Sequence, residues 1–215
     1  MGLMALLVYV DDILVTAPSL AYIQTVKDYL HSLFIIKDIG DARYFLGLEI
    51  AKNSAGIYVV QTKYVMDIIK DTSLTQGKTT STPFPLGLNL SEDCGALLSN
   101  LDSYIRPCDA HWKVVLHVVC YLKGCPSKRL FLPFQSNLSF KPSVMPTGHP
   151  DSRRSLTSFC IFLGDVVISW KTKKQSTVSH STAEAEYSSM AATICELRWI
   201  SYVMSDLGVF SEVAY

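Results

Sequence analysis

The chain carries two adjacent aspartates, Asp11 and Asp12, between two short apolar runs. The runs, residues 6–10 and 13–17, are rich in Val, Ile and Leu, so each is expected to form a strand. With so few residues between them, the two strands can pair only as a tight antiparallel hairpin. The sequence therefore predicts a hairpin held by apolar strands, with two carboxylates at its tip.

Two carboxylates on a rigid turn have two alternative explanations. Anchored carboxylates of this kind hold the two Mg²⁺ ions that nucleotidyl transfer requires. Aspartate is also a common turn residue for purely structural reasons. The two aspartates alone do not decide between these explanations, since so short a motif often occurs by chance.

Further periodic patterns predict both helices and strand hairpins. Apolar residues spaced three or four apart after Ser19 indicate an amphipathic helix, with that serine as its N-cap. Residues 71–108 are polar and contain several Pro and Gly, which is typical of a connection. Around them the sequence predicts a hairpin of residues 44–50 and 57–61, a helix at 63–69, a helix at 109–122 and a hairpin of residues 156–163 and 166–170.

The last predicted element is a long helix from Thr182 to about Leu207, with Gly208 as its stop. Ser181 and Glu184 have the spacing of a capping box. The helix is expected to face the core with its apolar residues Ala183, Tyr187, Met190, Ala191, Ile194 and Leu197. Strand hairpins and helices gathered in two groups predict the α+β fold class.

Composition limits the partners of the chain. With 19 basic and 19 acidic residues the formal net charge is zero, so any contact with nucleic acid must come from local patches. Six cysteines without a C-x-x-C pair indicate reduced thiols of an intracellular protein. No apolar run approaches the roughly 18 residues that a membrane span needs. We expect no membrane partner and no small-molecule cofactor.

The order of motifs over residues 6–69 resembles the palm of a copia-type reverse transcriptase. In that family the aspartates of Y-V-D-D, here Asp11 and Asp12, bind the catalytic Mg²⁺. The hairpin of Phe45, Leu46 and Gly47 resembles the grip that positions the primer strand. The family takes a further aspartate and its fingers from segments before Y-V-D-D, and this chain does not include them. The resemblance therefore implies an incomplete polymerase site.

The stretches D-S-R-R-S at residues 151–155, F-C-I-F-L-G at 159–164, 168–187 and E-L-R-W-I at 196–200 resemble the ribonuclease H segment of the same elements. In the wider fold a helix glutamate joins several aspartates to bind two metal ions that cleave the RNA of a hybrid. The resemblance assigns this role to Glu186, with Glu184 as the second choice. Five basic residues would contact the nucleic-acid backbone, although each alone is better explained as a charged surface residue: Arg153, Arg154, Lys171, Lys173 and Lys174.

The sequence also departs from the family pattern. Residues 143–149 read S-V-M-P-T-G-H where the family has an aspartate-rich strand, typically S-D-A-D-W. The chain stops at Tyr215, before the strand that supplies another aspartate in the family. Between Arg106 and Pro107 a helical connecting stretch of the family is missing. These losses predict that the ribonuclease H site is incomplete as well.

Together these observations predict three parts: residues 1–80 from the palm and primer grip, 81–126 as an internally deleted connection, and 127–215 as a partial ribonuclease H-like α/β domain. The predicted function is a catalytically incomplete fragment of a retrotransposon polymerase and ribonuclease H. Its parent would act on a primer–template or an RNA–DNA hybrid with Mg²⁺. Two alternatives stay open, a non-catalytic nucleic-acid-binding protein and a relic without activity.

Overall fold

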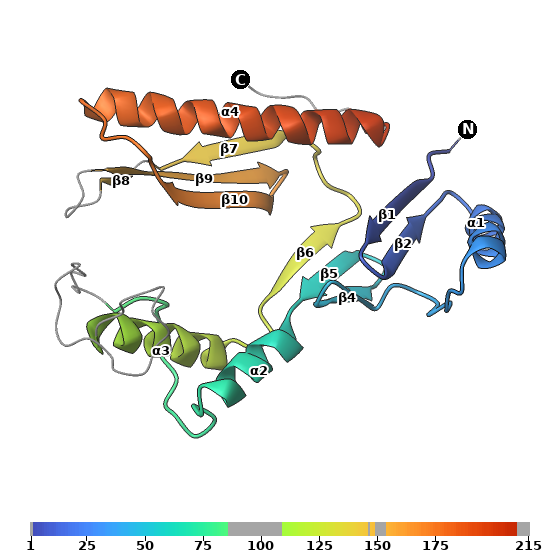
Figure 1. The fold of residues 1–215 in the computed structure, drawn as a ribbon, viewed down its shortest axis with the longest axis horizontal. Helices are drawn as coiled ribbons and strands as arrows, with labels where there is room; N and C mark the ends of the chain where they lie inside the picture. Colours follow the sequence, from blue (N-terminus) through green and yellow to red (C-terminus); the bar gives the residue numbers. More distant parts are fainter. Residues whose placement is uncertain (1, 86–108, 146, 149–153, 210–215) are drawn as a thin grey trace.

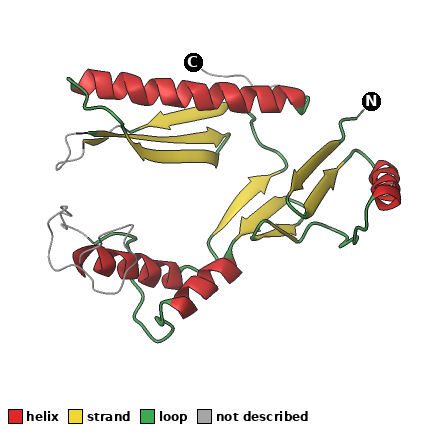
Figure 2. Cartoon of the chain, in the orientation of Figure 1, coloured by secondary structure: helices red, strands yellow, loops and turns green. Residues whose placement is uncertain are grey.

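Figure 1 shows the computed structural model of the chain, which describes residues 2–85, 109–145, 147–148 and 154–209. The described residues form a mixed α/β architecture, with one two-stranded hairpin, two four-stranded sheets and four helices (Figure 2). None of the described helices is long and apolar enough to cross a bilayer. The predicted mixture of strand hairpins and helices is confirmed at this level of detail.

The first hairpin forms as predicted. Strands β1 (Ala5–Tyr9) and β2 (Asp12–Thr16) pair antiparallel, with Tyr9 opposite Asp12. Helix α1 (Leu20–Leu33) follows, with Ser19 at its N-cap, although the serine side chain makes no capping hydrogen bond. Every residue of α1 and most of the hairpin is at least partly exposed. This region therefore contributes little to the core of the described chain.

The second sheet has the order β3 (Tyr44–Phe45), β4 (Leu48–Lys52), β5 (Gly56–Val60) and β6 (Arg129–Pro133). The single strand predicted at 44–50 is wrong, because the chain reverses at Leu46 and Gly47. Both residues have left-handed backbones, with φ of 51° and 77°. Two such residues in succession make the tight turn that matches strand twist, so β3 and β4 form a hairpin of their own.

Strand β6 joins this sheet from the second half of the chain. Its five residues pair with β5 in antiparallel register, from Arg129 opposite Val60 to Pro133 opposite Gly56. Along the chain, β5 and β6 are separated by two helices, α2 (Thr62–Asp71) and α3 (Asp109–Gly124). These helices pack on each other. The Lys123 ammonium of α3 donates to the carbonyls of Leu74, Thr75 and Gly77 at 3.1, 2.6 and 2.6 Å. These bonds tie the end of the α2 segment to α3.

The third sheet carries the main core. Its order is β10 (Val166–Lys174), β9 (Ser155–Leu163) and β7 (Phe140–Val144), with β8 (Thr147–Gly148) also paired to β9. Helix α4 (Thr182–Asp206) covers one face of this sheet (Figure 1). The predicted turn at Gly164 and Asp165 joins β9 to β10. The buried cluster between helix and sheet consists of Phe140, Phe159, Ile161, Leu197 and Ile200.

Both ends of α4 are as predicted. The Ser181 hydroxyl accepts from the backbone N–H of Glu184 at 3.1 Å, and the Glu184 carboxylate accepts from the N–H of His180 at 2.6 Å. The Ser181 bond is that of a capping box, while the Glu184 carboxylate accepts from the N–H of the residue before the N-cap instead of from that of Ser181 itself. Gly208 ends the helix with φ of 66°, and the N–H of Val209 donates back to the carbonyl of Met204 at 2.8 Å.

The buried face of α4 differs from the predicted one. Tyr187 and Ile194 of the predicted face are 71% and 52% exposed. The sheet is instead covered by a stripe of small or aliphatic residues, namely Ala185, Ser189, Thr193, Leu197 and Ile200. Ser189 and Thr193 satisfy their hydroxyls by donating to helix carbonyls four residues earlier. Small side chains let the helix approach closely, which a search for large apolar residues alone does not detect.

Candidate metal and nucleic-acid sites

Asp11 and Asp12 lie where the hairpin reverses. The turn contains Val10, whose φ of 49° is unfavourable for a β-branched residue. Both aspartates are exposed, and neither carboxylate has a hydrogen bond or ion pair within the described part of the chain. The hairpin thus presents two unpaired carboxylates on strands that are fixed by their mutual register.

The residues present do not fit a two-metal site. Such a site needs several carboxylates that converge on ions a few ångströms apart. Across residues 2–85, 109–145 and 154–209, no group of three or more His, Cys, Asp or Glu side chains is placed to hold a metal ion. Asp11 and Asp12 belong to the hairpin, while Glu186 belongs to α4 over another sheet (Figure 1).

Glu186 lies on the flank of α4 that is nearer to β7. The opposite flank is marked by Glu196, whose carboxylate accepts from the Ser169 hydroxyl of β10 at 2.9 Å. At about 100° per residue, Glu186 and Glu196 fall on either side of the buried stripe. Since β10 and β7 lie on opposite sides of β9, the exposed Glu186 carboxylate is on the β7 side.

The strand edge on that side is formed by β7 and β8, the segment in which the resemblance predicts missing aspartates. Val144 pairs with Phe159 and Thr147 pairs with Leu156, so β7 and β8 follow β9 in one register. The described residues of this segment, which include Met145, carry no carboxylate. The exposed Glu186 therefore lies on the side of a strand segment whose described residues carry no carboxylate, while Pro146 and His149 lie outside the described residues.

The predicted primer-grip residues form the β3–β4 turn. Phe45 is buried, with 9% of its surface exposed, so its side chain belongs to the core of its sheet. Leu46 is 42% exposed at the tip, beside Gly47. Of the three predicted primer-grip residues, only Leu46 and Gly47 are therefore placed where they could contact another molecule.

The predicted basic residues divide between the two faces of the third sheet. Lys171 pairs with Phe159 and Lys173 with Thr157, and these two β9 residues face α4. Because side chains alternate along a strand, Lys174 lies on the opposite face. No carboxylate of the described chain pairs with any of these three ammonium groups. Arg154 is exposed just before β9, and Arg153 lies outside the described residues.

A fourth lysine of this sheet is already engaged. The Lys141 ammonium of β7 lies 2.8 Å from the carboxylate of Asp165 in the β9–β10 turn. The hydrogen bond and charge of Lys141 lower the pKa of the Asp165 carboxyl below its ordinary value. Lys141 is therefore a less available phosphate partner than Lys171 or Lys173.

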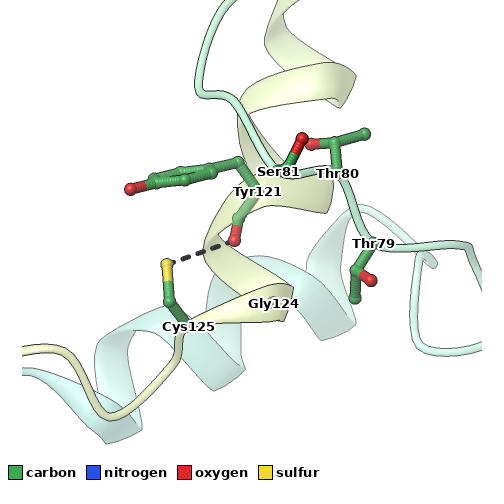
Figure 3. Close-up of a pocket in the computed structure, with 6 residues that line it drawn as sticks. All are labelled: Thr79, Thr80, Ser81, Tyr121, Gly124 and Cys125. Atoms are coloured by element: carbon green, nitrogen blue, oxygen red, sulfur yellow. Dashed lines mark hydrogen bonds between the residues drawn. The ribbon is translucent and has the colours of Figure 1, made fainter.

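A pocket of about 530 Å³ opens between the segment after α2 and the end of α3. Its lining is small and largely hydroxylated, and comprises Thr79, Thr80, Ser81, Tyr121, Gly124 and Cys125 (Figure 3). The Cys125 thiol donates to the carbonyl of Tyr121 at 3.3 Å within this wall. The pocket contains none of the predicted site residues.

Sequence reasoning missed Glu196, the half-buried glutamate of α4 that contacts the sheet. The signal was present in the sequence. Ala185, Ser189 and Thr193 recur every four residues, and a helix that buries this stripe brings Glu196 to its edge.

The chain is similar to known proteins over most of its length. The family model for reverse transcriptase (RNA-dependent DNA polymerase) matches residues 2–85. An uncharacterized mitochondrial protein of Arabidopsis thaliana is 36% identical, over 92% of this chain and 95% of the relative. The retrovirus-related Pol polyproteins from transposons RE2 and RE1 of the same plant are 30% and 29% identical over 95% of this chain. The chain belongs to the copia-type retrotransposon Pol family.

This Pol-family chain spans 16% of the length of each of these two polyproteins. It is a reverse transcriptase fragment of a retrotransposon Pol polyprotein, as predicted from the Y-V-D-D hairpin and the segment that follows it. The reverse transcriptase match covers β1 to β5, the helix α1 among them and the helix α2 that follows β5. No solved structure matches the chain. The ribonuclease H interpretation of the second half stays a prediction.

Proposed function

We propose that this Pol fragment is catalytically incomplete and combines part of a reverse transcriptase with part of a ribonuclease H. Residues 1–80 would derive from the palm and primer grip, 81–126 from a shortened connection, and 127–215 from the ribonuclease H. The alignment of Pol polyproteins over 95% of the chain supports a common origin of both halves. Strand β6, which the proposal assigns to the second part, pairs with β5 of the first.

The observation that carries the proposal is the isolation of the acidic residues. The reverse transcriptase family generally uses a divalent metal, and Mg²⁺ is the ion that the resemblance implies. Asp11 and Asp12 would be its ligands from the palm, yet no third ligand joins them in the described chain. Two adjacent carboxylates cannot orient two metal ions together with a primer end and a nucleotide.

The second half is proposed as ribonuclease H-like because of how its elements are arranged. Helix α4 packs over β9 and β7, and helical spacing puts Glu186 on its flank toward β7. In the resembling fold this is where a helix glutamate would meet strand aspartates. Here the described part of that strand segment carries none, so Glu186 alone represents the ancestral site.

Hybrid cleavage tests this half of the proposal. We expect the RNA of a labelled RNA–DNA hybrid to stay intact when the purified chain and Mg²⁺ are added, because Glu186 has no acidic partner among the described residues. The Glu186→Gln variant should give the same result on a denaturing gel. RNA cleavage by the wild-type chain that disappears in Glu186→Gln would contradict the proposal.

A non-catalytic function in nucleic-acid binding is the second candidate. Lys171 and Lys173 are exposed, lie on one face of β10 and have no carboxylate partner in the described chain. They are two residues apart, so their ammonium groups point the same way from the strand. Such a pair can contact successive phosphates of a primer–template or hybrid without reading its sequence.

A further inference from the structure

The sheet of β3 to β6 carries a stack of side chains that none of the sites above uses. Tyr58 of β5 lies opposite Phe131 of β6, and their rings stack with 4.6 Å between centroids and 26° between planes. The Arg129 guanidinium lies 4.6 Å from the centroid of the Tyr58 ring. Arg129 and Phe131 are two residues apart on β6, so all three side chains share one face of the sheet.

We propose that the stack of Arg129, Tyr58 and Phe131 binds unpaired nucleotides of single-stranded nucleic acid. Single-stranded nucleic acids bind to flat aromatic or guanidinium surfaces on which their bases stack, with cations nearby for the phosphates. The rigid sheet holds the two rings, and the Tyr58 ring in turn holds the guanidinium flat. Less side-chain entropy is then lost when a base stacks on the outer side of the guanidinium.

Arg129 is free to take a ligand. Its side chain is exposed, and no carboxylate of the described chain forms an ion pair with it. The acidic residue nearest in register on this face is Glu49, which pairs with Val60, the β5 partner of Arg129. One oxygen of the Glu49 carboxylate accepts from the backbone N–H of Lys63 at 2.9 Å, and no ion pair joins Glu49 to Arg129. The guanidinium donors therefore remain available for a phosphate.

The charge around β6 complements a phosphate backbone. Lys128 directly precedes β6, and its ammonium lies 5.6 Å from the centroid of the Tyr121 ring. Phe134 directly follows β6, and the Lys52 ammonium lies 5.5 Å from the centroid of its ring. The Lys52–Phe134 contact lies on the other face of the sheet, because Lys52 pairs with Ile57, the neighbour of Tyr58. On the face of the stack, a guanidinium over paired rings favours an unpaired strand over a protein partner with an apolar surface.

The proposal concerns unpaired bases only and does not depend on the proposed function. A duplex or hybrid keeps its bases stacked inside the helix, so it offers no free base to the guanidinium. The lysines of β10 lie on a different sheet and would contact phosphates alone. Failure of either proposal can therefore be recognised without the other.

The test compares binding of a fluorescein-labelled oligothymidylate to four full-length chains by fluorescence anisotropy. Arg129→Lys keeps the charge but removes the planar stack, and Tyr58→Leu removes the ring beneath the guanidinium. Since base stacking contributes roughly 1–3 kcal/mol per base, each variant should bind about ten-fold more weakly than wild type. Lys113→Ala is the control, because it removes an exposed cation of α3 outside the stack.

Arg129→Lys and Lys113→Ala together distinguish base stacking from phosphate attraction. Binding by phosphate attraction alone predicts a loss in Lys113→Ala and no change in Arg129→Lys, whereas stacking predicts the reverse. Unchanged affinity of Arg129→Lys, or absence of any binding by wild type, would overturn the proposal. An equal loss of affinity by Arg129→Lys for an RNA–DNA hybrid would also overturn it. Circular dichroism of Arg129→Lys, a surface substitution, confirms that the comparison is between folded chains.

Discussion

Replacing Phe140 with alanine is expected to lower the free energy of unfolding of the third sheet and α4 by about 3–5 kcal/mol. Phe140 is fully buried at the start of β7, where it packs with Ile161 of β9 and with Leu197 and Ile200 of α4. Removal of its ring leaves a cavity among residues from three elements, which cannot all move in to fill it. Urea unfolding followed by circular dichroism measures the change.

Phe34→Ala is the matched control for this prediction. Phe34 follows α1 and is 61% exposed, so the same ring is removed without a cavity. Its loss should change the free energy of unfolding by less than about 1 kcal/mol. Equal destabilisation by the two substitutions would show that the cluster around Phe140 is not the core that holds the second half together.

Replacing Lys171 and Lys173 together with alanine is expected to weaken binding of an RNA–DNA hybrid and to reduce its salt dependence. Each phosphate contact that is lost removes one released counterion, so the slope of log affinity against log salt should fall by about two units. The two lysines share a face of β10 and have no carboxylate partner in the described chain, so both are available to phosphates. Anisotropy titrations with a labelled hybrid at several salt concentrations give the slope.

The double variant Lys70→Ala/Lys113→Ala removes the same total charge from α2 and α3. Both lysines are exposed, each near an aspartate of its own helix. If net charge alone governed binding, this control would change the slope as much as the β10 variant does. That result would contradict a phosphate contact on β10.

Local patterns in the sequence predicted the elements that local chemistry determines. The hairpin around Asp11 needs only two β-rich runs and a short turn, and the cap of α4 needs only Ser181 and Glu184. Strand β6 was not predicted, because its five residues become a strand through pairing with β5, which lies far earlier in the chain. The Arg129 stack could not be inferred for the same reason.

The candidate site residues were likewise only partly predictable from the sequence. Resemblance proposed Asp11, Asp12 and Glu186 as metal ligands, but only the structure shows that they belong to separate elements of the fold. Periodicity of large apolar residues predicted the wrong face of α4, since Ser189 and Thr193 hide their hydroxyls in helix hydrogen bonds and pack like small apolar residues. The placement of Lys171 and Lys174 on opposite faces follows from strand alternation once β10 is known to extend to residue 174.

Primer extension tests the central claim most directly. The purified chain and its Asp11→Asn/Asp12→Asn variant are incubated with a labelled primer–template, deoxynucleotides and Mg²⁺, and the products are separated on a denaturing gel. Because the two aspartates lack further metal ligands in the described chain, neither protein should extend the primer. Extension by the wild-type chain that is lost in the variant would show that a complete polymerase site exists, and would contradict the account.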